Sequence, residues 1–193
     1  MKIKELLIKN LNASIDAKKL LIEDIINSQI FEDATNEVIN RYQNGGRLYI
    51  AGNGGSAADA QHLAAEFCGR FYKDRKAWPS DALHCNSSYL TAVANDYSYD
   101  VVYSRMVEGI AKEGDILIGL STSGNSKNIV KAFEQAKAMG VCTIGFTGAG
   151  GGVMKQWSDH LLAVPSKDTP RIQESHILIG HIICELAEAA LVS

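Results

Sequence analysis

One stretch of the sequence constrains the fold more than any other, because an apolar run over residues 116–120 passes directly into a short polar loop. Four of the six loop positions carry a hydroxyl: Ser121, Thr122, Ser123 and Ser126. Apolar residues at helical spacing follow at once: Ile129, Val130, Phe133 and Ala136. A buried strand, a tight turn and a helix N-terminus in this order are typical of a parallel α/β sheet.

The polar loop at 121–126 also has a predictable chemistry. A helix N-terminus presents free backbone N–H groups and the positive end of the helix dipole, and both favour an anion. The hydroxyls add donors without adding bulk, so a phosphate monoester is the ligand that suits the loop. The simpler alternative is an ordinary strand-to-helix loop with Ser126 as N-cap. Four hydroxyls in six residues favour phosphate binding.

The bulk properties exclude several classes of protein. A chain of 193 residues has the size of one large domain, and its net charge of −3 argues against a nucleic-acid partner. There is neither a signal-peptide core nor an apolar run of roughly 18 residues, which predicts a cytoplasmic protein without a membrane partner. The cysteines form no Cys-x-x-Cys pair and are expected to be buried thiols of a reducing compartment: Cys68, Cys85, Cys142 and Cys184.

The first 44 residues are expected to form a helical extension. A helix over 2–27 carries apolar residues on more than one side, and a second helix is predicted over 31–43. One sheet face covers only one stripe of a helix. Burial against another subunit is therefore favoured over ordinary packing within the domain.

The remainder of the chain alternates between strand and helix patterns. Strands are predicted at 47–51, 82–84, 115–120, 141–146 and 160–164, and helices at 57–71, 88–94, 101–111, after Ser126 and at 169–191. This alternation predicts a three-layer αβα sandwich, with a mostly parallel, flavodoxin-like sheet of about five strands. Ligands of such folds bind at the carboxyl ends of the strands, where the Gly- and Ser-rich turns occur.

The turn after the first strand contains Gly52-x-Gly54-x-x-Ala57, which formally matches a dinucleotide fingerprint. That fingerprint requires an acidic residue near the end of a second strand, about 20 residues on. Here that region, 72–76, is a charged segment with no strand pattern. Small residues that let the backbone approach a ligand are the better interpretation, with Ser56 as helix cap and Asp59 as its partner.

Two of the predicted helices carry the residues best suited to catalysis or metal binding. His62 and Glu66 are four apart and share one helix face, while Gln173 and His181 are eight apart on the last helix. Together these side chains would suit acid–base work on a phosphosugar, or a divalent metal site with zinc favoured by ligand type. A solvated ion pair and a core histidine remain the plainer alternative. His176 is expected to serve packing.

These motifs, taken together, resemble the sugar isomerase (SIS) domain family over nearly the whole length. The resemblance rests on Gly52–Ser56, His62 to Glu66, Asn95-Asp96, Ser121–Ser126, Thr147-Gly148 with its glycine run, and Arg171–Glu174 to His181. It implies a single SIS domain over 1–193, with 1–44 used for oligomerisation into a homotetramer.

The resemblance also implies roles for individual residues. Glu66 and His181 match the catalytic pair, and the zinc ligands, one ion per subunit, would be His62, Glu66, Gln173 and His181. Substrate contacts would come from Asn53, Gly54, Gly55, Glu66, Asn95, Asp96, Ser121, Thr122, Ser123, Ser126 and Gln173.

The implied activity is that of an intramolecular oxidoreductase, an aldose–ketose isomerase. It would interconvert D-sedoheptulose 7-phosphate and D-glycero-D-manno-heptose 7-phosphate, the first step toward ADP-heptose or GDP-heptose for lipopolysaccharide or surface glycans. The alternative is a non-catalytic sugar-phosphate-binding regulator, such as a replication-initiator-associating SIS protein. Such a regulator would not need Glu66 or His181.

Overall fold

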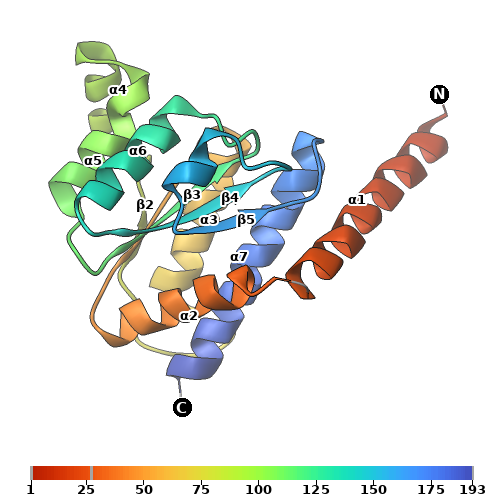
Figure 1. Cartoon of the computed structure of the whole chain (residues 1–193), viewed down its shortest axis with the longest axis horizontal. Helices are drawn as coiled ribbons and strands as arrows, with labels where there is room; N and C mark the ends of the chain where they lie inside the picture. The colour runs from red at the N-terminus through yellow and green to blue at the C-terminus, as the bar shows by residue number, and fades with distance from the viewer. Residues whose placement is uncertain (1, 27, 193) are drawn as a thin grey trace.

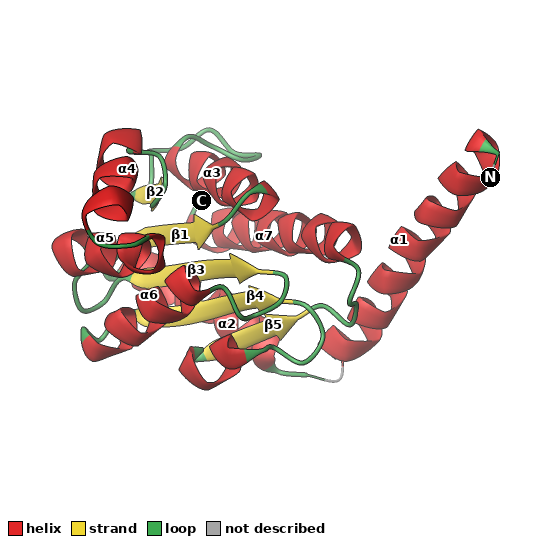
Figure 2. Cartoon of the chain, turned by 90° about the horizontal axis from the view of Figure 1, so that it is seen from above, coloured by secondary structure: helices red, strands yellow, loops and turns green. Residues whose placement is uncertain are grey.

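The computed structural model of the chain describes residues 2–26 and 28–192, and these contain a five-stranded sheet in the order β2-β1-β3-β4-β5. Every neighbouring pair of strands is parallel, so the arrowheads in Figure 2 point the same way. The strands are β1 (Leu48–Gly52), β2 (Ser80–Ala82), β3 (Ile116–Ser121), β4 (Cys142–Thr147) and β5 (His160–Ala163). The predicted flavodoxin-like parallel sheet is confirmed.

Helices connect successive strands and cover both faces of the sheet (Figure 1). They are α1 (Ile3–Ile26), α2 (Ile30–Gln43), α3 (Gly55–Cys68), α4 (Ser87–Asp96), α5 (Val102–Ile110), α6 (Lys127–Ala138) and α7 (Thr169–Leu191), with short 3₁₀ helices η1 (Tyr99–Val101) and η2 (Val153–Trp157). Met1, Asn27 and Ser193, which the predicted domain includes, lie outside the described residues.

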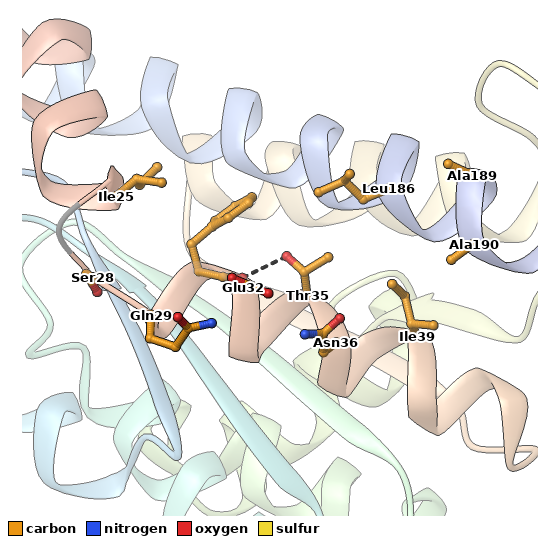
Figure 3. Close-up of a pocket in the computed structure, with 11 residues that line it drawn as sticks. Ile25, Ser28, Gln29, Glu32, Thr35, Asn36, Ile39, Leu186, Ala189 and Ala190 are labelled. Atoms are coloured by element: carbon orange, nitrogen blue, oxygen red, sulfur yellow. Dashed lines mark hydrogen bonds between the residues drawn. The ribbon is translucent and has the colours of Figure 1, made fainter.

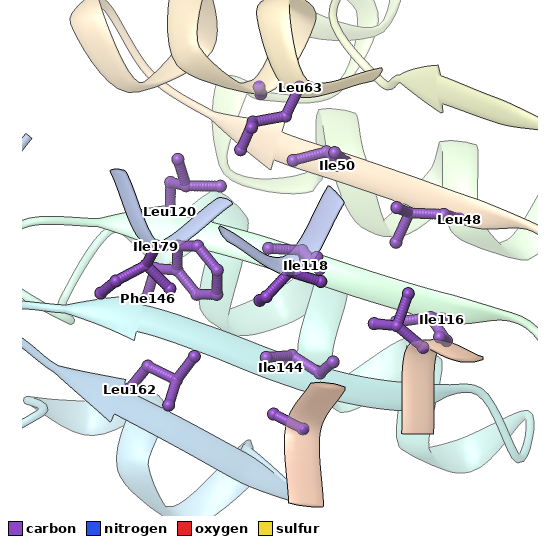
Figure 4. Packing of buried hydrophobic residues seen from close by; sticks show 14 of the residues in the cluster. Leu48, Ile50, Leu63, Ile116, Ile118, Leu120, Ile144, Phe146, Leu162 and Ile179 are labelled. Carbon is purple, nitrogen blue, oxygen red and sulfur yellow. The ribbon is translucent and has the colours of Figure 1, made fainter. Parts of the chain in front are cut away.

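The two faces of the sheet bury separate cores, because side chains alternate along each strand. Ile116, Ile118 and Leu120 of β3 face α2, α3 and α7, where they meet Leu63 and Ile179 (Figure 4). On the other face, strand residues pack against α5 and α6: Tyr49, Ala51 and Leu117. The helix face predicted after Ser126 is buried there as expected.

The strand order reverses direction between β1 and β3, which lie side by side in the middle of the sheet. The connection from β1 leads to one side and that from β3 to the other, so their loops diverge at the carboxyl edge. The turn at 53–55 and the hydroxyl loop at 121–126 follow these two strands directly. The topology therefore brings the two predicted ligand loops to one crevice.

Several predicted boundaries are wrong by a few residues. β2 ends at Ala82, two residues before the predicted end, and His84 lies in the following turn. Asn95 and Asp96 form the last turn of α4 rather than following a helix that ends at Ala94. α3 ends at Cys68, not near 71, and this shorter helix leaves Cys68 exposed.

The expectation of four buried thiols also needs correction. Cys142 in β4 and Cys184 in α7 are buried, whereas Cys68 and Cys85 are exposed because both lie where an element has just ended or turned. All four are free thiols.

The N-terminal helix α1 projects from the body of the molecule (Figures 1 and 2), and its contacts with α7 begin at Asn10, whose carbonyl accepts a hydrogen bond from Arg171 at 2.8 Å. Ala17 and Leu21 are buried against the body. Large apolar side chains along the helix are exposed: Ile3, Leu6, Leu7, Ile8, Leu11, Ile15, Leu20 and Ile22. Among the described residues, no helix combines the length and the apolar character needed to cross a lipid bilayer.

Candidate active site

The turn after β1 is held from two sides. The buried Tyr103 hydroxyl donates to the Gly52 carbonyl at 2.6 Å, which fixes the end of the strand. Gly54 then adopts φ +56°, a conformation that residues with a side chain rarely take, and α3 begins immediately at Gly55. The backbone at 53–55 is therefore open to a ligand, as the small residues predict.

The capping pattern proposed for this turn is wrong. α3 starts at Gly55 with Gly54 as its N-cap, so Ser56 lies inside the first turn and caps nothing. The positive φ of Gly54 lets the helix begin earlier than a hydroxyl cap would. The buried Ser56 instead lies 3.4 Å from the Gln173 amide nitrogen, across the gap to α7.

The hydroxyl loop forms a tight turn between β3 and α6. The Ser121 and Ser126 hydroxyls lie 2.9 Å apart, so they close the loop on itself. Ser126 stands at the N-cap position of α6, but it makes no side-chain cap bond because its hydroxyl is engaged with Ser121. Thr122 is half-buried, and Ser123 is exposed. A helix N-terminus of this kind offers N–H groups to an anion, although the Ile129 N–H already donates to the Asn128 side-chain oxygen.

The glycine run after β4 braces this loop. Gly124 has φ +65°, and a β-carbon there would collide with the Gly151 carbonyl. The Met154 N–H donates to the Gly124 carbonyl at 2.9 Å, and the Gly148 N–H donates to the Thr122 carbonyl at 3.0 Å. The glycine run that follows Thr147 thus packs against the hydroxyl loop and supports its conformation.

A second group of polar side chains lies between α3 and α7. The His62 Nε2 is 3.1 Å from the Glu66 carboxylate and 3.3 Å from the Nε2 of His181. One donor atom from each of the three residues lies within 4.8 Å of the others. The two helices, 119 residues apart in sequence, therefore bring together three of the residues that sequence analysis selected.

The environment of His181 favours its neutral imidazole form. Burial lowers the pKa of His181, and the neighbouring His62 lowers it further, while Glu66 and Asp59 oppose both effects. The ring of Phe71 stacks on His181, with centroids 5.4 Å apart. Two imidazole nitrogens and a carboxylate oxygen are a donor set that suits Zn²⁺. The two Nε2 atoms lie 3.3 Å apart, so they can share a hydrogen bond when one of them carries a proton, or both can bind one cation.

Gln173 lies closer to the turn after β1 than to this cluster. Its amide fills the space beside Gly55, where a β-carbon would come within 2.7 Å of the amide nitrogen. Within the described residues, its side chain donates a hydrogen bond to Ser56 and makes none with His62, Glu66 or His181.

A pocket of about 430 Å³ opens beside Gln173 and connects the turn to α7. Asp59, from α3, also lines it, and one of its carboxylate oxygens is buried without a hydrogen-bond partner among the described residues. Burial raises the pKa of Asp59, against the lowering effect of His62 and His181. Sequence analysis treated Asp59 only as a capping partner, although its position three residues before His62 places it on the same helix face.

Asn95 and Asp96 remain apart from the cluster. The Asn95 amide donates to the Asp96 carboxylate at 2.9 Å, and both residues are exposed on the last turn of α4. The connection to the crevice runs through Tyr99, three residues on, whose hydroxyl donates to the Asn53 side chain at 3.1 Å. The segment therefore reaches the turn after β1 at Tyr99, and among the described residues neither Asn95 nor Asp96 makes a side-chain hydrogen bond to the site.

His176 occupies a packing position, as predicted. It is fully buried, with its ring 5.8 Å from that of Phe146 and its Nε2 3.0 Å from the Thr147 carbonyl. Burial lowers its pKa to about 4, although the carbonyl partly compensates.

This buried histidine is expected to make the protein sensitive to mild acid. Its folded pKa lies below the unfolded value, so only the unfolded chain takes up the proton as the pH falls from about 6.5 to about 4. The free energy of unfolding is expected to fall by roughly 3 kcal/mol over that range through this residue alone. Urea unfolding at fixed protein concentration should show a flatter pH dependence for His176→Gln. Parallel profiles for the two proteins would contradict this assignment.

Comparison with known proteins agrees with the fold. The SIS domain family model matches residues 15–148. The phosphoheptose isomerase of Aneurinibacillus thermoaerophilus is 50% identical over 182 residues, which cover 94% of this chain and 92% of that protein.

Two solved structures share the whole architecture. The phosphoheptose isomerase from Neisseria gonorrhoeae superposes with a TM-score of 0.90 at 37% identity, covering 97% of this chain and 100% of that one. The enzyme of the same name from Francisella tularensis superposes with a TM-score of 0.92 at 30% identity, covering 98% and 100%. Matching sequence and fold lead to one conclusion: the chain belongs to the SIS domain family, in which it is similar to the phosphoheptose isomerases.

Proposed function

We propose that the chain is an aldose–ketose isomerase that interconverts D-sedoheptulose 7-phosphate and D-glycero-D-manno-heptose 7-phosphate. The observation that carries this proposal is the meeting of Glu66 and His181, from separate helices, with His62 between them. A sugar-phosphate-binding regulator needs the hydroxyl loop but has no use for a carboxylate–imidazole cluster. We infer a seven-carbon substrate because the chain is similar to phosphoheptose isomerases.

In the proposed reaction, the phosphate binds at the N-terminus of α6, within the hydroxyl loop, and the open chain extends toward the groove between α3 and α7. Glu66 takes a proton from C1 of the ketose and returns it to C2 through an enediol or enediolate. His181 transfers a second proton from the C1 hydroxyl to the C2 oxygen. Both side chains are only half-buried in the single chain, so the substrate itself excludes water from them.

A zinc ion is a further part of the proposal. The donors that would hold it are His62, Glu66 and His181, with Gln173 as the fourth predicted ligand. When bound, the ion would polarise a substrate oxygen and stabilise negative charge.

The decisive experiment is isomerisation of sedoheptulose 7-phosphate by metal-stripped protein, with and without added zinc. We expect turnover to the aldose phosphate, with higher kcat in the presence of zinc. A folded protein that binds the sugar phosphate without converting it under either condition would instead be a regulator.

The same proposal includes a homotetramer in which α1 packs at the centre. A groove of about 910 Å³ lies between α2 and α7, at the foot of α1, with Phe31, Ile39 and Leu186 among its apolar lining (Figure 3). Together with the exposed apolar side chains of α1, it offers apolar surface that other subunits could cover. The number of subunits follows from the family resemblance. Light scattering should give the mass of four chains, and a monomeric mass at micromolar concentration would contradict this.

The place of the reaction in metabolism belongs to the proposal as well. The aldose product retains its 7-phosphate and its free C1, so it can be activated later at C1 by a nucleotide. We propose that it supplies ADP-heptose or GDP-heptose synthesis in the cytoplasm for a surface glycan such as lipopolysaccharide.

A further inference from the structure

A pair of side-chain amides joins the two loops of the site. The Asn53 amide nitrogen donates to the Asn128 side-chain oxygen at 3.0 Å, and the Asn128 amide nitrogen donates back to Asn53 at 2.8 Å. Asn53 follows β1, whereas Asn128 lies in the first turn of α6, directly after the hydroxyl loop. Asn128 is 3% exposed, so this reciprocal pair is shielded from water on one side.

A third element closes on the same amide. The Tyr99 hydroxyl donates to the Asn53 side-chain oxygen at 3.1 Å, and the Ile129 N–H donates to the Asn128 side-chain oxygen at 3.0 Å. Each of the two oxygens therefore accepts two hydrogen bonds, which is the full capacity of a side-chain carbonyl. Because each side-chain amide is held by three hydrogen bonds, neither amide can rotate without breaking several of them at once.

The amide pair lies between the loop proposed to bind phosphate and the turn that leads to Glu66, so it influences the distance between them. The phosphate loop is part of the β3–α6 connection, whereas Glu66 lies on α3, which continues from the Asn53 turn, and His181 lies on α7 beside it. His62 lies seven residues beyond Gly55, about 10 Å along the helix axis. A long open-chain sugar phosphate can bridge the two loops, and the rigid link at Asn53–Asn128 determines how long it must be.

We propose that Asn128 and Tyr99 are positioning residues that act through Asn53 to hold the phosphate loop at a fixed distance from Glu66 and His181. By fixing this distance, they select the chain length of the sugar phosphate that is isomerised. The inference rests on the proposed isomerase function. Neither residue stands out in the sequence, because the contact joins positions 75 residues apart.

Chain-length preference is the measurement that a purely structural role would not change. We expect Tyr99→Phe to lower the ratio of kcat/KM for sedoheptulose 7-phosphate over a five-carbon ketose 5-phosphate by three- to fivefold. Asn128→Ala should lower that ratio at least tenfold, because it removes both bonds of the reciprocal pair. The competitive inhibition constant of inorganic phosphate, which occupies the loop alone, should change less than twofold in Tyr99→Phe.

The matched control is Tyr89→Phe. The Tyr89 hydroxyl also donates to an oxygen, the Val102 carbonyl, at 3.1 Å, but it makes no contact with Asn53. This variant should retain the wild-type preference. If Asn128→Ala proves insoluble, Tyr99→Phe still tests the proposal, because Tyr99 is half-exposed and the change removes one oxygen only.

A double-mutant cycle tests whether Tyr99 acts through Asn53. In the Asn53→Ala background, Tyr99→Phe should cause no further loss of chain-length preference. Equal losses for the two substrates, or additive effects in the cycle, would overturn the inference while leaving the isomerase assignment intact. A wild-type protein that converts neither substrate would overturn both.

Discussion

The Glu66→Gln variant is expected to lose between about a hundredfold and ten-thousandfold in kcat for sedoheptulose 7-phosphate, the range typical of removing a general base. The amide has nearly the shape of the carboxylate but cannot accept the C1 proton. Glu66 is half-buried on α3 with its carboxylate 3.1 Å from His62, and the hydroxyl loop belongs to a different connection. Inorganic phosphate should therefore bind to the variant as it binds to the wild type.

A matched control separates loss of the base from general damage. Glu37 also pairs with a residue four positions on, Arg41 at 2.6 Å, and its side chain is 25% exposed, against 24% for Glu66. It lies near the opposite end of the sheet, beside the segments that lead into β1 and β3. Glu37→Gln should keep kcat within twofold. Measuring bound zinc in both proteins shows whether Glu66→Gln acts through lost metal, and undiminished turnover in Glu66→Gln would exclude Glu66 as the base.

Local patterns were sufficient to predict most of the fold. The apolar run before Ser121 and the helical spacing after Ser126 lie within one short stretch, and the sheet follows from the repetition of such units. The predicted start of α3 was wrong because a glycine, and not a hydroxyl residue, occupies its N-cap position. The positive φ of Gly54 starts α3 without a hydroxyl cap, and no side-chain pattern announces it.

The site divides in the same way. His62 and Glu66 could be paired from their spacing on one helix, whereas the contact between His62 and His181 depends on how α3 packs on α7. Residue type and spacing singled out both helices, and the family resemblance then assigned their residues to one site. No resemblance pointed to Asn128 or Tyr99, because their bonds to Asn53 depend on the side-by-side placement of β1 and β3.

The same dependence on long-range packing produces the second large effect, at Glu188 near the end of α7. Its side chain is 2% exposed, yet the structure satisfies it fully with the backbone N–H groups of residues 71–73, at 2.8–2.9 Å, and with Arg75 Nε at 2.9 Å. Burial alone would raise the pKa of Glu188, but these donors outweigh burial and hold its pKa below the ordinary value. The stabilisation is therefore present near neutral pH and lost only in acid.

Glu188→Gln is expected to lower the free energy of unfolding by about 3–5 kcal/mol, because it leaves the charge of the buried Arg75 unpaired. For a chain of this length that corresponds to a fall in Tm of roughly 10 °C. Thermal unfolding at fixed protein concentration measures it. Glu185→Gln is the control, since Glu185 is exposed on the same helix and should change stability by less than about 0.5 kcal/mol.

A second comparison identifies which bonds of Glu188 matter most. Replacing both partners of a buried ion pair by apolar residues often restores stability, because no charge is left unpaired. Here Glu188→Leu combined with Arg75→Met should recover little, since the three N–H groups of residues 71–73 would lose the carboxylate that all of them donate to.

The loop at 71–73 also connects this stability to the reaction. Phe71 stacks on His181, and Arg75 donates to the Glu66 carbonyl at 2.9 Å. We therefore expect Glu188→Gln to lower kcat even at temperatures where the variant is folded. Full recovery of stability in the double variant would instead mean that the ion pair, and not the loop, is what Glu188 stabilises.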